Sequence, residues 1–170
     1  MTLLSTQPVI ESFKLGMRQF ASGVCLITSI HDGQRAGLVA TAVNSVSMEP
    51  PTLLICINRS ASAFDVVERS GIFCVNVLPV DCLNVAGQFS SSQRREERFQ
   101  HGQWSELETG APVLDEAMVS FDCQVVHSLP YHSHTIFLGE VRAVKLREET
   151  SAPLLYLDRQ YRHVSQHAVL

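Results

Sequence analysis

The sequence predicts a mainly β protein, an antiparallel β-barrel with a few short helices packed outside it. β-rich apolar runs recur along the chain, and most neighbouring runs are joined by turns too short for a helical crossover. The helical patterns between these runs are also short. With 170 residues, 45% of them hydrophobic and 18% charged, the composition is that of a globular protein, and we expect residues 1–170 to form a single domain.

The first third of the chain begins with a helical pattern and continues as strands. Apolar residues at helical spacing predict a helix over 9–23. The β-rich run 24–30 leads into Asp32-Gly33, a pair typical of tight hairpin turns, so 36–47 is expected to return antiparallel to it. Two prolines then stop this strand, and the nearly continuous apolar run 52–58 predicts a central strand.

The rest of the chain alternates short helices with longer strands. A helix is expected over 62–71, with Ser62 as its N-cap and Gly71 at its end. The polar and charged stretch 90–103 is the best candidate for a mobile surface segment. The other predicted elements are a strand over 72–80, a short helix over 81–89, long strands over 117–129 and 134–146 separated by a Pro-Tyr-His turn, and two short elements in the tail.

Charge, hydropathy and cysteine usage argue against several classes of protein. The formal net charge of −4 and the pI near 5.9 do not favour nucleic-acid binding, which needs a basic surface. No apolar run approaches the roughly 18 residues that span a bilayer, and the N-terminus lacks the pattern of a secretory signal, so we expect a cytoplasmic protein without membrane contact. The five cysteines lack zinc-like spacing and are expected to be reduced and structural.

Several motifs of known chemistry are missing. No GxGxxG, P-loop or GxSxG segment occurs, which argues against a Rossmann nucleotide site and an acyl-transfer hydrolase. His132 and His134 would share a face on a strand and could chelate a metal, but no third ligand can be named. We therefore expect no metal site, and favour one functional histidine or two that face solvent.

Residues 41–51, TAVNSVSMEPP, depart from the alternation of a half-buried strand. Thr41, Asn44, Ser45 and Ser47 stand between two runs that look buried, and neither face of the strand is cleanly apolar. A buried polar group without a partner costs about 1–3 kcal/mol. Either a ligand satisfies these groups, or they pair with neighbouring loops or face solvent, and the pattern alone leaves both interpretations open.

Three segments, AGLVATAVNSVSMEPPTLLICINRSASAF, ERF and SHTIFLGEV, together resemble the flavin reductase-like family. These are the small reductases that serve two-component flavin monooxygenases such as 4-hydroxyphenylacetate 3-monooxygenase. The resemblance extends from Phe13 to the closing PLLYLDRQYRHV. It implies a split β-barrel homodimer that binds FMN or FAD at the subunit interface and takes electrons from NADH or NADPH. The missing GxGxxG agrees with this, because the family holds both ligands without a Rossmann domain.

The resemblance also implies which residues bind the cofactor. The strand after Gly37 should border the isoalloxazine and contact its polar edge or the ribityl chain, and the loop 58–62 resembles the phosphate-side loop. Hydroxyls, a guanidinium and a helix N-terminus can hold an anion there, although helix capping by the serines is an alternative. The implied cofactor-binding residues are Ala40, Thr41, Ala42, Asn44, Ser45, Asn58, Arg59, Ser60, Ser62, Phe89 and Tyr161.

One histidine is the implied catalytic residue. SHTIFLGEV resembles the family segment GDHTIFIGEV, whose histidine lies near the nicotinamide, and this carries over to His134. Ser133 stands where an aspartate is common, so a carboxylate that could orient the histidine is missing. A half-buried strand histidine is the alternative. Whether Arg94, Arg95 or Arg98 touches a phosphate is left open.

These features predict an NAD(P)H:flavin oxidoreductase that transfers hydride from nicotinamide to bound FMN or FAD, chemistry that the cofactor itself carries. The favoured role is the reductase component of a two-component flavin monooxygenase, acting as a homodimer. Two alternatives stay open: a corrin reductase, acting on cob(II)yrinic acid a,c-diamide in cobalamin biosynthesis, and a flavin-binding module without turnover. The residues do not decide between FMN and FAD, between NADH and NADPH, or among the final electron acceptors.

Overall fold

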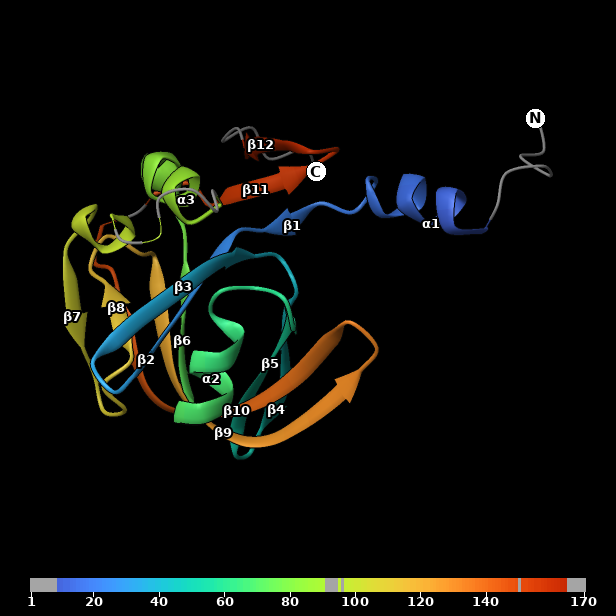
Figure 1. Cartoon of the computed structure of the whole chain (residues 1–170). Coiled ribbons are helices and arrows are strands. Elements are labelled where there is room, and N and C mark those ends of the chain that lie inside the picture. The colour runs from blue at the N-terminus through green and yellow to red at the C-terminus, as the bar shows by residue number, and fades with distance from the viewer. Residues whose placement is uncertain (1–8, 91–94, 96, 150, 165–170) are drawn as a thin grey trace.

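The computed structural model describes residues 9–90, 95, 97–149 and 151–164, and its centre is a seven-stranded antiparallel sheet (Figure 1). The strands run in the order β3-β2-β6-β9-β10-β5-β4. This confirms the predicted mainly β, antiparallel split barrel with short peripheral helices. The strand bounds are β2 Cys25–His31, β3 Gln34–Ala40, β4 Val43–Met48, β5 Pro51–Asn58, β6 Ile72–Val77, β9 Val119–Tyr131 and β10 His134–Leu146.

Two smaller sheets and several short helices surround the main sheet. Figure 1 shows α2 against the main sheet and α1 extending away from the rest of the molecule. None of the helices in the described ranges has the length and apolar character needed to span a bilayer. The elements are a sheet of β1 Ser22–Gly23, β11 Leu154–Leu157 and β12 Gln160–His163, a pair of β7 Trp104–Glu106 and β8 Pro112–Leu114, the α-helices α1 Val9–Met17, α2 Phe64–Ser70 and α3 Leu83–Ser90, and the 3₁₀ helices η1 Val80–Cys82 and η2 Arg98–Gln100.

The β2–β3 hairpin forms where the Asp-Gly pair predicts it. Asp32 and Gly33 have φ angles of 49° and 76°, so both turn residues adopt the left-handed conformation that a two-residue hairpin turn requires. Gly71 likewise ends α2 in the left-handed conformation, with φ 67° and its N–H donating to the carbonyl of Val67. These local predictions are confirmed.

Strand β2 is buried on both faces, and each face belongs to a different apolar cluster. Leu26 packs in one cluster with Phe89 of α3. Ile27 packs in the other with Ile55 of β5 and Phe73 of β6. The apolar run of β2 is therefore continuous rather than alternating, as expected for a strand covered on both sides. Each fully buried Leu or Ile side chain stabilises the fold by about 1.5–3 kcal/mol.

A buried polar cluster around Asn76 of β6 connects four strands. Its Nδ2 donates to the carbonyl of Leu26 and to Oγ1 of Thr28 on β2, each at 3.1 Å. Its Oδ1 accepts from the backbone N–H of Leu114 on β8 and from Oγ of Ser120 on β9, each at 2.9 Å. Both donors and both lone pairs of the amide are used, which is the condition under which a buried polar side chain stabilises a fold.

Residues 36–47 were expected to form one strand, and they form two. Strand β3 ends at Ala40, and β4 begins at Val43 and pairs with β5 instead of β2. The carbonyl of Ala42 accepts a hydrogen bond of 3.1 Å from the N–H of Cys56, so the chain has changed its pairing partner before β4 begins. The first helix is also shorter than 9–23, because α1 ends at Met17 and tight turns follow it.

Other expectations are corrected in the second half of the chain. Ser62 does not cap α2, because the N-cap is Ala63 and it makes no side-chain cap bond. The stretch 90–103 is not simply a surface segment, since Arg98 within it is buried; part of this stretch lies outside the described residues. The turn between the two long strands lies at His132-Ser133, while the proline and tyrosine before it belong to β9. Strands β1, β7 and β8 were not predicted.

The cysteines agree with the expected structural role. All five are free thiols, and four of them, Cys25, Cys74, Cys82 and Cys123, are buried. Burial raises the pKa of Cys25 to about 11 and that of Cys123 to about 12, in the second case with help from the neighbouring charge of Asp122. Thiols with such pKa values are protonated and unreactive near neutral pH.

Candidate flavin site

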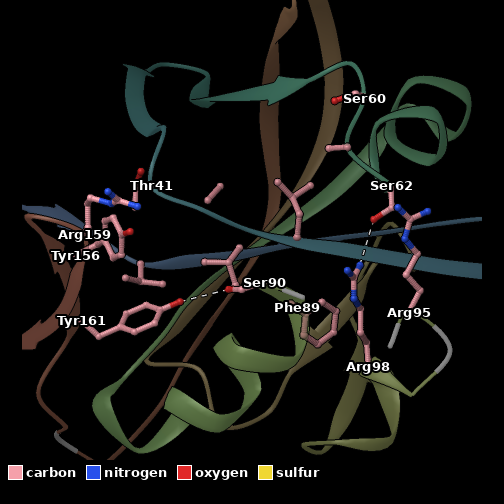
Figure 2. A pocket seen from close by; sticks show the side chains of 15 residues that line it. Thr41, Ser60, Ser62, Phe89, Ser90, Arg95, Arg98, Tyr156, Arg159 and Tyr161 are labelled. Atoms are coloured by element: carbon pink, nitrogen blue, oxygen red, sulfur yellow. Dashed lines mark hydrogen bonds between the residues drawn. The ribbon is translucent and has the colours of Figure 1, made fainter. Parts of the chain in front are cut away.

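A cavity of about 640 Å³ lies where β3 ends (Figure 2). It is bounded by β3, the loop after β5, the end of α3, the region of η2 and the β11–β12 hairpin. Its volume falls within the range of about 300–1,000 Å³ typical of small-molecule sites. The residues that line it are Val24, Leu38, Val39, Ala40, Thr41, Ser60, Ala61, Ser62, Phe89, Ser90, Arg95, Arg98, Tyr156, Arg159 and Tyr161.

Phe89 forms part of the cavity wall and is fixed by aromatic neighbours. The residue is only 3% exposed, and its ring lies 5.2 Å from that of Phe99 in an edge-on arrangement and 5.8 Å from that of Trp104, measured between centroids. Gly37 of β3 makes room for the ring, because a Cβ at this position would lie 2.7 Å from Phe89 Cε1. Packing from α3, η2, β3 and β7 therefore sets this part of the wall.

Arg98 and Arg95 make one end of the cavity basic. The Arg98 Nη1 donates to the carbonyl of Gly37 at 3.0 Å and to Oγ of Ser62 at 3.1 Å, so the guanidinium joins β3 to the loop after β5. Burial lowers the pKa of Arg98, and the like charge of Arg95 lowers it further. Figure 2 shows both arginines at the end of the cavity where Ser62 lies. An anion at this end would be stabilised by both charges.

Two tyrosines of the β11–β12 hairpin bound the other end. Tyr156 and Tyr161 are cross-strand partners whose ring centroids lie 5.6 Å apart. The Tyr161 hydroxyl lies 3.3 Å from Oγ of Ser90, which connects the hairpin to the end of α3. Arg159 stands in the hairpin turn with a φ of 62° and also lines the cavity. This end thus combines aromatic rings with one cation.

About half of the predicted cofactor-binding residues come together in this cavity. The polar stretch after β3 contributes only Thr41, while Asn44 and Ser45 are exposed on the edge strand β4. Asn58 uses its Oδ1 to accept from the N–H of Ser60 at 2.9 Å and from its Oγ at 2.8 Å, which shapes the loop that lines the cavity. The predicted residues in the cavity are Ala40, Thr41, Ser60, Ser62, Phe89 and Tyr161; those outside its lining are Ala42, Asn44, Ser45, Asn58, Arg59 and His134.

His134, the predicted catalytic residue, is exposed and begins β10. Its Nδ1 lies 2.9 Å from Oγ of Ser133, so a hydroxyl occupies the place expected for an orienting group. The tip of the β9–β10 hairpin is bonded to the loop 58–62, because the N–H of Arg59 donates to the carbonyl of Ser133 at 2.8 Å and Asn58 is the register partner of His134. His134 therefore adjoins this loop while standing outside the cavity lining. Within the described ranges, no three His, Cys, Asp or Glu residues gather as metal ligands.

Some lining residues were not predicted from the sequence. Ser90, Tyr156 and Arg159 line the cavity, and Arg95 and Arg98 do so as well, although the sequence left their role open. Arg94 lies outside the described residues. A signal for Tyr156 existed: a two-residue Asp-Arg turn in LYLDRQY makes it the cross-strand partner of the predicted Tyr161. For Ser90 we find no such signal.

Comparison with known proteins assigns the family. The flavin reductase like domain matches residues 17–165. The chain belongs to this family. The FMN reductase (NADH) RutF of Methylorubrum populi is 43% identical over 166 residues, covering 95% of this chain and 82% of the relative. The structure of the flavin reductase PheA2 superposes with a TM-score of 0.82 at 31% identity, covering 92% of this chain and 98% of the other.

The structure of a third relative contains nucleotide ligands. The NADH:FAD oxidoreductase SgcE6 of Streptomyces globisporus, in complex with NAD and FAD fragments, superposes with a TM-score of 0.85 at 25% identity and covers 94% of this chain and 95% of the other. The residues of the present cavity suit a flavin, since the strand end at Thr41 offers polar partners and the opposite end offers guanidinium and hydroxyl groups for a phosphate.

Proposed function

We propose that this chain is an NADH-dependent FMN reductase whose flavin lies in the cavity beside β3. The asymmetry of the cavity carries the proposal. One end is the more basic, with Arg95 and Arg98 beside Ser62, and the other combines the rings of Tyr156 and Tyr161 with the single cation of Arg159. FMN has the same asymmetry, because its phosphate is an anion and its ring system is flat and uncharged. The relatives named FMN reductase (NADH) support this choice.

The residues of the chain position the reactants, and the bound flavin supplies the hydride chemistry. Arg98 is held in place before a ligand arrives, because it already bonds to Gly37 and Ser62. Thr41 stands where the strand breaks and can bond to the polar edge of the ring. This arrangement lowers the entropic cost of orienting the flavin, which is the main task of the protein in such a reaction.

We assign His134 to the nicotinamide side of the site. Ser133 occupies its Nδ1, which leaves Nε2 as the nitrogen available to a ligand. The His134→Ala variant should slow hydride transfer while leaving the FMN dissociation constant nearly unchanged, as measured by stopped-flow reduction with NADH and by flavin fluorescence. Loss of FMN binding with an unchanged rate of flavin reduction would contradict the assigned role.

We further propose that the functional unit is a cytoplasmic homodimer. None of the α1 residues is buried, and Phe13 and Met17 are 63% and 48% exposed. A helix of nine residues is marginal in water by itself, so its apolar face needs a partner surface. The edge strand β4, where Val46 and Met48 are 49% and 81% exposed, offers such a surface on a second copy. The Phe13→Asp variant should shift the light-scattering mass from dimer to monomer, and a monomeric parent protein would contradict the assembly.

Comparison of FMN with riboflavin tests the flavin site directly, because riboflavin lacks only the phosphate. FMN should bind at least about tenfold more tightly than riboflavin, since a hydrogen bond to a charged group is worth about 1.5–3 kcal/mol. The exposed Arg95→Gln variant should reduce this preference, whereas the matched Arg142→Gln variant, which breaks the Arg142–Glu140 ion pair outside the cavity lining, should keep it. A protein that binds neither flavin would overturn the proposal.

Turnover with different electron acceptors tests the role of the reduced flavin. We expect NADH oxidation to accelerate when free FMN is added, as required of an enzyme that supplies reduced flavin to an acceptor such as a monooxygenase component. Anaerobic reduction of a cobalt(II) corrinoid with little turnover of free FMN would instead identify a corrin reductase. Tight FMN binding without any NADH oxidation would identify a flavin-binding module.

A further inference from the structure

The turn between β11 and β12 has an unusual residue in a demanding position. Asp158 and Arg159 have φ angles of 48° and 62°, so both adopt the left-handed conformation of a two-residue hairpin turn. The turn between β2 and β3 has the same first residue, Asp32, but its second residue is Gly33, with a φ of 76°. Glycine adopts this conformation without a steric cost, whereas the Cβ of any other residue is crowded in it. The later turn therefore holds an arginine where the backbone alone favours glycine.

Backbone contacts hold this turn in place. The N–H of Asp158 donates to the carbonyl of Arg18 at 3.0 Å. Strand β11 also pairs with β1, where Ser22 is the register partner of Tyr156. Residues in sparsely populated backbone conformations persist where the surrounding structure determines them, and they cluster at ligand sites. The left-handed conformation of Arg159 therefore suggests a function for its side chain.

The Arg159 side chain brings a positive charge to the flavin cavity. Figure 2 shows it at the end where Thr41 lies, opposite the end with Arg98. None of the described residues that line the cavity is acidic. In the part of the chain that the structure describes, none of the ion pairs involves Arg159. Its charge is therefore available to a ligand in the cavity.

Hydride transfer to a flavin creates a negative charge on the flavin ring. The nicotinamide gives up a hydride, which is one proton with two electrons, and becomes a cation; the neutral oxidised ring takes up the hydride and becomes an anion. A cation near the ring therefore stabilises the reduced form more than the oxidised form, and such charges are one means by which a protein tunes a flavin. The proposed function has the phosphate near Arg98, so the ring would reach the end that Arg159 lines.

We propose that Arg159 sets the reduction potential of bound FMN, because its guanidinium stabilises the negative charge of the reduced ring. The inference deepens the proposed FMN reductase function and rests on it. Arg159 is exposed, so solvent and salt screen part of its charge. We expect it to favour reduced over oxidised FMN by about tenfold, which corresponds to about 30 mV for a two-electron couple. Arg98 has no such preference, since it faces a phosphate whose charge is the same in both redox states.

The test measures the binding of the two redox states separately. Flavin fluorescence gives the dissociation constant of oxidised FMN, and anaerobic reductive titration against a dye of known potential gives the potential of bound FMN; together they give the dissociation constant of reduced FMN. In Arg159→Gln, reduced FMN should bind about tenfold more weakly and the potential should fall by about 30 mV, with oxidised FMN bound as in the parent. Arg159→Lys keeps the charge and should retain most of the potential. The difference between Arg159→Gln and the parent should shrink in about 1 M salt.

Two further variants separate this role from a structural one. Arg162→Gln removes the same charge from the same hairpin but outside the cavity lining, so it should leave the potential unchanged. Arg159→Gly suits the left-handed turn, so it should keep or raise the melting temperature and still lower the potential.

Three results would overturn the proposal: an unchanged potential in Arg159→Gln, equal weakening of both redox states in that variant, or the same fall in potential in Arg162→Gln. Failure of the proposed function gives a different result, because the parent protein itself would then not bind FMN or would not oxidise NADH.

Discussion

The close approach of Gly37 to Phe89 makes Gly37→Ala a direct test of how the cavity wall is held. The new Cβ would lie 2.7 Å from Phe89 Cε1 and 2.9 Å from Phe89 Cδ1, whereas ordinary contact begins at 3.4 Å. The ring would have to retreat by about 0.7 Å. Phe99 and Trp104 already pack against it, so the ring must either displace these neighbours or shift toward the cavity.

Overpacking of this kind costs about 1–3 kcal/mol. For a chain of 170 residues, a cost of about 2 kcal/mol lowers the melting temperature by about 4–8 °C. FMN binding should weaken as well, because the carbonyl of Gly37 accepts the hydrogen bond that positions Arg98 and because the ring lines the cavity. Each 1.4 kcal/mol of the cost that falls on the bound state raises the FMN dissociation constant tenfold.

Thermal unfolding and FMN fluorescence titration measure the two effects. Gly87→Ala is the matched control, because Gly87 lies on the same helix as Phe89 and a Cβ there would meet nothing within 4 Å. It should keep or raise the melting temperature, since alanine favours a helix by about 1 kcal/mol over glycine. Combining Gly37→Ala with Phe89→Leu should recover part of the loss. If Gly37→Ala keeps both the parent melting temperature and the parent FMN affinity, the packing argument is wrong.

Three further predictions concern stability and thiol reactivity. Asn76→Leu should lower the free energy of unfolding by about 3 kcal/mol or more, because it leaves buried polar groups without partners, and an unchanged urea midpoint would contradict this. Hydrogen bonds from Lys145 and Ser105 lower the pKa of Asp115 below its ordinary 3.8, so the Lys145–Asp115 pair should stabilise the fold fully at pH 7 and lose this contribution as the pH falls through the folded pKa of Asp115. Lys145→Met removes the pair, so its loss of unfolding free energy, measured by urea unfolding, should be larger at pH 7 than at pH 3. A loss that does not change with pH would refute this. Buried Cys25, with a pKa of about 11, should resist maleimide at pH 8 until urea unfolds the chain, and rapid labelling of the folded protein would show the opposite.

Local sequence rules were sufficient to predict structure at positions where the required backbone conformation is one that few residues adopt. The Asp32-Gly33 turn and the end of α2 at Gly71 follow from conformations that few residues adopt, so the sequence determines them without knowledge of the rest of the fold. The two long strands after residue 117 were also predictable, because each is a long β-rich run bounded by turn residues. Their pairing with β6 and β5 was not, since it depends on contacts between distant segments.

Prediction was weakest for residues whose side chains bond to distant parts of the cavity instead of to their own helix or loop. Ser62 precedes a helix and has the side chain of an N-cap, yet its hydroxyl accepts from Arg98, 36 residues further along the chain. Arg98 stands in a charged run typical of a solvated surface, but it is only 6% exposed. A sequence pattern depends on neighbours along the chain. It cannot show that the hydroxyl of Ser62 and the carbonyl of Gly37 accept hydrogen bonds from this guanidinium in the folded protein.

The polar stretch after Ala40 was also difficult to interpret from the sequence, because its surroundings depend on how whole strands pair. The edges of the main sheet are β3 and β4, which are consecutive in the chain and joined through Thr41 and Ala42. Since Ala42 already bonds toward β5, the two edge strands do not pair in the part of the chain that the structure describes, and the barrel stays split at this junction. An open sheet edge exposes unpaired backbone groups that a fold normally covers. The cavity lies along this edge, so a bound flavin would occupy the space between the two edge strands, a space that would not exist in a closed barrel.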